Sequence, residues 1–182
     1  MDIGTGIVLV LGGARSGKSE VGERLVAAVS SAAPVTYIAT GQIADATADP
    51  AWAARVAAHR ARRPSPWETV EVGAGGDLAA ALGAATGVVL VDSLGTWLAG
   101  LPAFGGETDV AAPLLRAFDA RRATGRPTVL VSEEVGLGVH PSSAAGQQFR
   151  DALGALNRTL ADTADQVLLV VAGRVLPLSE LP

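Results

Sequence analysis

Near the amino terminus the sequence reads Gly12-Gly13-Ala14-Arg15-Ser16-Gly17-Lys18-Ser19, which follows the pattern G-x-x-x-x-G-K-S. The apolar run 7–11 before it predicts a buried strand, and the spacing of apolar residues over 19–29 predicts a helix. A strand, a glycine-rich turn and a helix N-terminus together bind phosphate, because converging backbone N–H groups and the helix dipole attract anions. A chain with 22 glycines can match the pattern by chance. The flanking strand and helix, which the mechanism requires, favour nucleotide binding.

Two side chains of this loop have expected roles. Lys18 is expected to reach the β- and γ-phosphates of a nucleotide, and the Ser19 hydroxyl to bind Mg²⁺. Lys18 is the only lysine among 14 basic residues. The scarcity of lysine accompanies abundant alanine and glycine and is typical of coding bias. A compact ammonium is then retained where a point charge on phosphate oxygens is useful, a task that the planar guanidinium performs differently.

Composition restricts the class of protein. A length of 182 residues fits one domain, 1–182, with a substantial core. The absence of cysteine excludes disulfides and thiolate zinc sites, and the two histidines lie far apart. We find no apolar run that could span a bilayer and no basic signal sequence, so we expect a cytoplasmic protein. The net charge of −4 argues against general affinity for nucleic acid.

Strands and helices are predicted to alternate along the chain. This alternation is typical of the α/β class, here a P-loop NTPase fold with a mostly parallel central sheet and helices on both faces. The pattern predicts that the chain closes with a strand over 167–171. The further strands are predicted at 35–39, 68–72, 88–92 and 128–131, and the further helices at 50–63, 77–84, 94–101, 110–123 and 147–164.

Several polar residues stand where predicted parallel strands end. Asp92 ends the strand 88–92, where a carboxylate is expected to face Mg²⁺ or its water shell. Thr40 and Gly41 follow the strand 35–39, and Glu133 or Glu134 follows the strand 128–131. Ligands of open α/β sheets bind at the carboxyl ends of the strands. An ordinary strand-to-loop turn explains Thr40 and Gly41 equally well.

An arginine-rich segment surrounds the first of the two histidines. Arg55 and His59 are four residues apart on a predicted helix, and Arg60, Arg62 and Arg63 follow with no acidic residue between positions 50 and 67. Such a face attracts polyphosphates, and its histidine could act as an acid, a base or an acceptor of a phosphoryl or nucleotidyl group. By spacing alone, the pattern is more typical of a solvated arginine-rich helix with an incidental histidine.

The second histidine, His140, precedes Pro141 in a loop. We interpret it as a structural or surface histidine.

Seven ordered blocks extend over nearly the full chain. They are Gly12 to Ser19, Tyr37-Ile38-Ala39-Thr40, Arg55-Val56-x-x-His59 with Arg63-Pro64, Trp67-x-Thr69-x-Glu71, Asp92-x-Leu94-x-x-Trp97-Leu98, Glu134-Val135-Gly136-x-Gly138 with Pro141, and Phe149-Arg150-Asp151-x-x-Gly154-x-x-Asn157. In this set the chain resembles the bifunctional adenosylcobinamide kinase / adenosylcobinamide-phosphate guanylyltransferase family of cobalamin biosynthesis. It departs from the family pattern at Glu133, where many relatives carry asparagine, at Gln147, where arginine is usual, and at Gly100, where asparagine is common.

The resemblance implies a function and a homotrimeric assembly. A nucleoside triphosphate, ATP or GTP, would phosphorylate adenosylcobinamide, and GTP would then transfer GMP through a guanylylated His59 to that phosphate, releasing pyrophosphate. The implied catalytic residues are His59 and Lys18, and the implied metal ligands are Ser19 and Asp92. The implied nucleotide-binding residues are Gly12, Gly13, Ala14, Arg15, Ser16, Gly17, Lys18, Ser19, Ala39, Thr40, Gly41, Arg60, Ala61, Arg62, Arg63, Glu71 and Asp92.

Two other functions fit parts of the sequence. A kinase of a small metabolite without a covalent step would use His59 to orient its substrate. A nucleotide-dependent switch ATPase would explain the loop, Asp92 and the parallel sheet, but would leave the arginines around His59 without a role.

Overall fold

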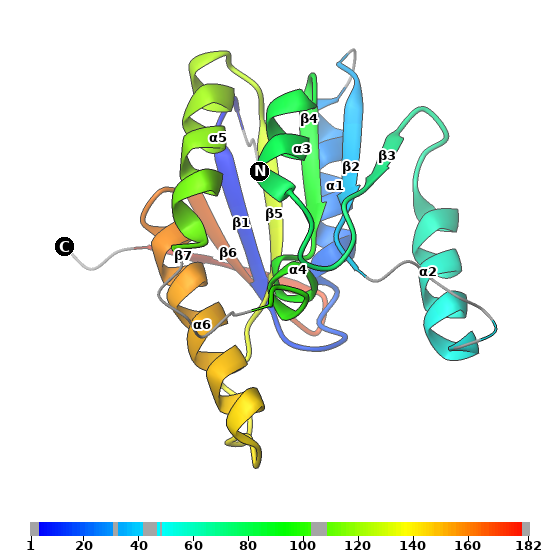
Figure 1. The fold of residues 1–182 in the computed structure, drawn as a ribbon. Coiled ribbons are helices and arrows are strands. Elements are labelled where there is room, and N and C mark those ends of the chain that lie inside the picture. The colour runs from blue at the N-terminus through cyan, green and yellow to red at the C-terminus, as the bar shows by residue number, and fades with distance from the viewer. Residues whose placement is uncertain (1–3, 31–32, 42–46, 48, 103–108, 180–182) are drawn as a thin grey trace.

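The computed structural model describes residues 4–30, 33–41, 47, 49–102 and 109–179. A seven-stranded sheet with the order β3-β2-β4-β5-β1-β6-β7 forms its centre (Figure 1). The neighbouring strands run parallel, except that β6 and β7 are antiparallel. The strands are β1 Ile7–Gly12, β2 Val35–Ala39, β3 Glu68–Glu71, β4 Val88–Asp92, β5 Thr128–Glu133, β6 Gln166–Val171 and β7 Arg174–Leu178.

Helices cover both faces of this sheet. They are α1 Lys18–Val29, α2 Pro50–Arg62, α3 Leu78–Ala84, α4 Leu94–Ala99, α5 Ala111–Ala123 and α6 Ala144–Ala161. One apolar core lies between α1 and the sheet, and a second lies under α3, α4, α5 and α6. Figure 1 shows α2 beside β3, at one edge of the sheet. The prediction of a mostly parallel α/β sheet with helices on both faces is therefore confirmed.

Some predicted boundaries are wrong. The chain does not close with β6, because β7 follows through a tight turn in which Ala172 and Gly173 both have positive φ. β7 is short and exposed and contains Pro177, so it carries no alternating pattern. α6 begins three residues earlier than predicted, because the Ser143 side chain accepts a hydrogen bond from the Gly146 N–H, and it also ends earlier, at Ala161. No helix of the described residues is long and apolar enough to cross a membrane.

The strand register brings the ends of four strands together. Gly12, at the end of β1, pairs with Glu133 at the end of β5. Asp92, at the end of β4, pairs with Val131 of β5 on one side and with Ala39 of β2 on the other. The loop that follows β1, the carboxylate of Asp92 and the tip of β2 therefore share one edge of the sheet, as parallel pairing requires.

A buried arginine connects helices and strands at the opposite end of the sheet. Arg121 of α5 is 2% exposed, and burial lowers its pKa to about 10. Its Nε donates to Thr128 Oγ1 at 2.7 Å, and its Nη atoms donate to backbone carbonyls of Leu82, Ala85, Gly87 and Pro127. These bonds join the end of α3 to the starts of β4 and β5.

The substitution Arg121→Met should lower the free energy of unfolding by about 3 kcal/mol or more, because it leaves several buried carbonyls without a donor. Urea denaturation followed by circular dichroism measures this loss. Arg116→Met on the same helix is the matched control, since Arg116 is exposed, and should change stability by less than about 0.5 kcal/mol. Equal unfolding midpoints for the two variants would show that Arg121 does not hold these elements together.

Candidate active site

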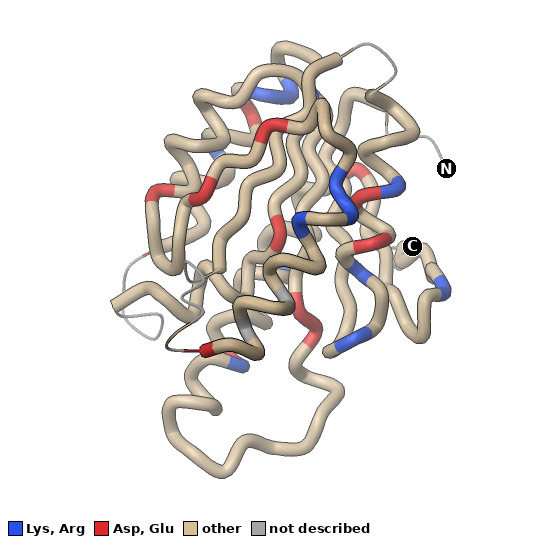
Figure 2. Tube along the Cα trace, turned by 90° about the vertical axis from the view of Figure 1, so that its right-hand side faces the viewer, with Lys and Arg blue, Asp and Glu red and all other residues tan. Residues whose placement is uncertain are grey.

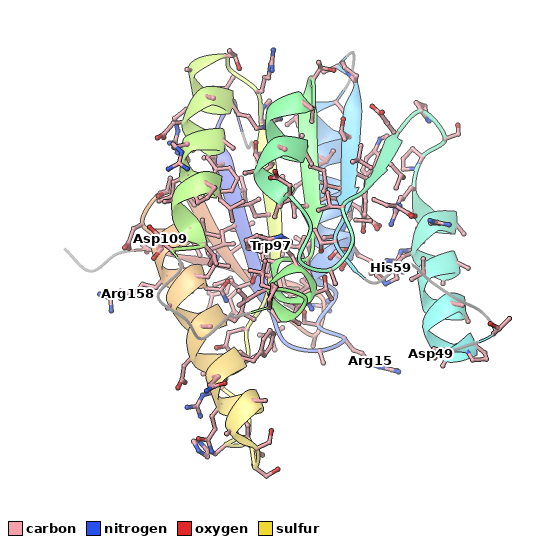
Figure 3. The ribbon with its side chains drawn as sticks, viewed as in Figure 1. Arg15, Asp49, His59, Trp97, Asp109 and Arg158 are labelled. Atoms are coloured by element: carbon pink, nitrogen blue, oxygen red, sulfur yellow. The ribbon has the colours of Figure 1, made fainter. Side chains whose placement is uncertain are left out.

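The glycine-rich loop joins β1 to α1. Gly17 precedes α1 with φ +93°, and a Cβ on it would lie 3.4 Å from the Gly173 Cα in the turn before β7. A residue with a side chain would be strained in this conformation, so the turn requires glycine. Lys18 Nζ lies 3.4 Å from the Gly13 carbonyl oxygen and 3.5 Å from Glu133 Oε1. The ammonium group therefore folds back over the loop, while Arg15 extends outward from it (Figure 3).

Three side chains converge on the Asp92 carboxylate. Ser19 Oγ donates to Oδ1 at 3.1 Å, and the Tyr37 hydroxyl donates to Oδ2 at 2.5 Å. His59 Nδ1 lies 3.8 Å from Oδ2. Burial and the adjacent Asp92 charge raise the pKa of Tyr37, so this hydroxyl keeps its proton and remains a donor. One carboxylate thus connects the glycine-rich loop, β2 and α2.

His59 projects from α2 toward the sheet (Figure 3). Its side chain is only 24% exposed. Arg62 Nη2 lies 3.4 Å from His59 Nδ1, and Arg62 Nε lies 3.5 Å from Glu23 Oε2 on α1. Burial raises the pKa of Glu23, although Arg62 opposes this shift. The histidine therefore lies against the glycine-rich loop and not on an outer, solvated face of its helix.

The arginines after His59 are paired with groups from other elements. Arg60 forms an ion pair with Glu71 of β3. The Arg63 guanidinium carbon lies 3.4 Å from the centroid of the Tyr37 ring, and Arg63 Nη1 donates to Thr69 Oγ1 at 3.1 Å. Figure 2 looks onto α2 and shows its basic carboxyl end beside acidic segments. The Arg55 side chain lies outside the described part of the structure.

Two hollows meet beside the glycine-rich loop and His59. The first, a cavity of about 460 Å³, has the size of a small-molecule site. The second is a hollow of about 580 Å³ that is lined mainly by the loop, the start of α1 and the carboxyl end of α2. Lys18, Ser19 and His59 line both of them. A nucleotide on the loop would therefore lie within reach of the histidine.

Most of the residues implied by the resemblance line one of these hollows. The first is lined by Ala14, Lys18, Ser19, Ala39, Gly41, His59, Arg60, Arg63, Glu71 and Asp92, and the second adds Arg15, Ser16, Gly17 and Arg62. Four of them, Gly12, Gly13, Thr40 and Ala61, line neither hollow. Thr40 is fully buried, and its hydroxyl donates to the Ser93 carbonyl oxygen at 2.5 Å, so this side chain connects the ends of β2 and β4.

Part of the cavity wall was not predicted from the sequence. Glu133 and Glu134, which the sequence places at the end of a strand, line the first cavity. The further lining residues are Tyr37, Val56, Ser93, Gly95, Thr96, Ala99, Val135 and Phe149. Several of these belong to α4, whose position directly after Asp92 is the signal that could have indicated them. His140 is exposed, lies 2.6 Å from Arg150 Nη1 through its Nδ1, and lines neither hollow.

The oxygen atoms of Ser19 and Asp92 suit a metal ion that is bound together with a nucleotide. Ser19 Oγ and Asp92 Oδ1 lie 3.1 Å apart at the first cavity. Mg²⁺ binds through one or two protein oxygens together with phosphate oxygens and water, which matches this pair. Among the residues that the structure describes, no group of three or more His, Cys, Asp or Glu side chains could hold a metal ion by itself.

Fold and site together define a P-loop nucleotide-binding protein. The fold is similar to that of the flagellar accessory protein FlaH from Methanocaldococcus jannaschii, with a TM-score of 0.56 and 13% sequence identity over 94% of this chain and 75% of FlaH. At that identity the similarity concerns the fold alone.

The sequence comparisons identify the family. Residues 8–178 match the family described as cobinamide kinase / cobinamide phosphate guanyltransferase. The chain is 38% identical to the bifunctional adenosylcobalamin biosynthesis protein CobP of Pseudomonas aeruginosa, over 96% of this chain and 98% of CobP. It is also 38% identical to the corresponding CobU of Salmonella typhimurium, over 92% and 96% of the two chains. The chain therefore belongs to the cobinamide kinase / cobinamide phosphate guanyltransferase family, and the resemblance in its ordered blocks is confirmed.

Proposed function

We propose that this protein phosphorylates adenosylcobinamide and then transfers GMP from GTP to adenosylcobinamide phosphate, forming adenosylcobinamide-GDP and pyrophosphate in cobalamin biosynthesis. Membership of the family supports both reactions. The observation that carries the proposal is that Lys18, Ser19 and His59 line the same cavity and that Ser19 and His59 both approach Asp92. A switch ATPase would leave this placement of His59 without a purpose.

The phosphoryl transfer depends mainly on positioning and on neutralising charge. Backbone N–H groups of residues 12–19 and the dipole of α1 would hold the phosphates of ATP or GTP. Lys18 would then contact the β- and γ-phosphate oxygens. Ser19 and Asp92 would hold Mg²⁺, which would supply positive charge to neutralise the phosphate oxygens during the transfer.

The guanylyl transfer uses two displacements at the same phosphorus. In the first, a ring nitrogen of His59 attacks the α-phosphorus of GTP, a nitrogen–phosphorus bond forms and pyrophosphate leaves. In the second, a phosphate oxygen of adenosylcobinamide phosphate attacks this phosphorus, and the bond to the histidine breaks. Asp92, 3.8 Å from His59 Nδ1, would orient the ring and stabilise its cationic form.

The remaining implied residues have proposed roles around the nucleotide. Ala39, Gly41, Arg60, Arg63 and Glu71 line the first cavity and would surround the guanine nucleotide. Thr40 and Ala61 would act by shaping the neighbouring backbone. Gly12 and Gly13 would act through the backbone of the loop.

The assembly is also part of the proposal. We infer that residues 1–182 act as one P-loop domain, that the enzyme is a homotrimer, and that it works in the cytoplasm, where its nucleotide substrates are found. Exposed apolar side chains at Val175, Leu176 and Leu178 of β7 offer a surface for subunit contacts. Light scattering coupled to gel filtration should give three times the chain mass of 18.3 kDa, and a mass equal to one chain would contradict the trimer.

Replacing the single lysine tests the position of the nucleotide. Lys18→Ala removes the ammonium aimed at the phosphates, so both transfers should fall by about a hundredfold or more. Product formation measured by chromatography of the corrinoids checks this. Arg24→Ala, an exposed basic residue on the same helix, should leave both rates unchanged. Rates in Lys18→Ala close to those of the wild type would mean that the nucleotide binds elsewhere.

Replacing the histidine tests the covalent step. His59→Ala should form no GMP adduct and no adenosylcobinamide-GDP, while phosphorylation, which needs the loop and not an imidazole, should continue in part. Intact-protein mass spectrometry after incubation with GTP and Mg²⁺ detects the adduct, which should be acid-labile and base-stable, as a phosphoramidate is.

His140→Ala is the matched control and should behave as the wild type. If the adduct persists in His59→Ala, or is lost in His140→Ala, the nucleophile is not His59. If no adduct forms in the wild type while phosphorylation proceeds, the protein is a metabolite kinase without a covalent step.

A further inference from the structure

A second carboxylate lies beside the lysine of the loop. Glu133 ends β5, the strand that lies between β1 and β4, so its position is between the loop and Asp92. Its Oε1 lies 3.5 Å from Lys18 Nζ. The side chain lines the first cavity and is 26% exposed, so a ligand can contact it.

The surroundings of Glu133 fix its carboxylate in one orientation. Ser93 Oγ donates to Oε1 at 2.8 Å, and the Gly95 N–H donates to Oε2 at 3.0 Å. The Glu133 backbone carbonyl accepts from Asn157 Nδ2 at 3.0 Å. A Cβ at position 95 would overlap Oε2, so glycine there leaves room for the carboxylate. A group held so firmly at both ends is already positioned for a reaction.

The other two carboxylates of this region contact groups other than Lys18. Asp92 accepts from Ser19 and Tyr37 and faces His59. Both oxygens of Glu134 accept from backbone N–H groups of its own loop, those of Gly136 at 2.8 Å and Leu137 at 3.0 Å. Glu133 also accepts hydrogen bonds, but of the three it is the carboxylate that lies beside Lys18, so it is the one best placed to interact with a substrate there.

The apolar part of the wall of this cavity indicates which substrate this is. Ala99, Val135 and Phe149 line the same cavity, whereas Arg60 and Glu71 contribute charged groups to it. Apolar side chains suit the carbon skeleton of an acceptor alcohol better than the phosphates of a nucleotide. Because Lys18 is expected at the γ-phosphate, an alcohol that contacts Glu133 would lie beside the phosphorus that it attacks.

We propose that Glu133 is a catalytic general base of the phosphoryl transfer, which rests on the kinase activity proposed above. The acceptor hydroxyl gives its proton to the Glu133 carboxylate, and its oxygen forms a bond to the γ-phosphorus. The bond from that phosphorus to the β–γ bridging oxygen breaks, and the nucleoside diphosphate leaves. Glu133 then returns the proton to solvent.

A purely structural role for Glu133 makes a different prediction. If the carboxylate only holds the start of α4 and the position of Lys18, its loss should slow both reactions that use the loop by the same factor. If it is the base, phosphorylation should fall by far more than guanylylation of His59, which involves no hydroxyl. The ratio of the two rates in one protein sample therefore separates the two roles.

The experiment compares single-turnover phosphorylation of adenosylcobinamide by ATP with adduct formation from GTP. In Glu133→Gln, which keeps the shape of the side chain but not its basicity, phosphorylation should fall by about a hundredfold or more. Adduct formation should fall by less than about tenfold. Gly95→Ala, which displaces the carboxylate without removing it, should change the ratio in the same direction. Glu68→Gln, at an exposed position of β3 outside both hollows, should leave both rates unchanged.

Three results with the variants would overturn the assignment. Phosphorylation by Glu133→Gln within threefold of the wild type would show that no base acts there. An equal loss of both reactions would show a structural role. A larger loss of phosphorylation in Glu134→Gln than in Glu133→Gln would assign the base to Glu134. A wild-type protein that forms the adduct but phosphorylates no corrinoid would instead contradict the proposed kinase activity itself, and the assignment with it.

Discussion

The arrangement of the site depends on the Asp92 carboxylate. It accepts hydrogen bonds from Ser19 of the loop and Tyr37 of β2, and it faces His59 of α2. These residues are far apart in the sequence, and they meet because the sheet order places β4 beside β2 and one strand away from β1. A side chain only 10% exposed that carries a negative charge needs such donors, since an unpaired buried carboxylate would cost several kcal/mol. The polar contacts that stabilise Asp92 are thus the same contacts that position the histidine next to the loop.

The three arginines at the carboxyl end of α2 and just after it already have partners within the protein. Arg60 and Arg62 are paired with acidic groups of β3 and α1, and Arg63 lies on the Tyr37 ring. Partly exposed ion pairs of this kind contribute about 1 kcal/mol or less each, and charge-assisted bonds to phosphate are stronger. A nucleotide phosphate could therefore take over a guanidinium from its present partner at little cost. These contacts connect the carboxyl end of α2 to β3, α1 and Tyr37 of β2.

The sequence predicts most of the fold, because the signals involved are local. The pattern from Gly12 to Ser19 and the apolar strands are readable from neighbouring residues, and the position of Asp92 follows from its strand. Long-range partners are not readable in this way. Glu23 and Glu71, which neutralise the arginines, come from other elements, and nothing near Arg121 indicates that it is buried among carbonyls from three segments. β7 was missed because a short exposed strand with a proline has no periodic pattern. The choice between Glu133 and Glu134 likewise needed the contacts that each carboxylate makes.

The most direct test of the account is a crystal structure of the protein after reaction with GTP and Mg²⁺. The account predicts GMP bonded through its phosphorus to a ring nitrogen of His59, with the imidazole still beside Asp92 and the phosphate within reach of Lys18. GMP bonded to any other residue, or a guanylylated His59 that lies away from both Asp92 and the loop, would contradict it.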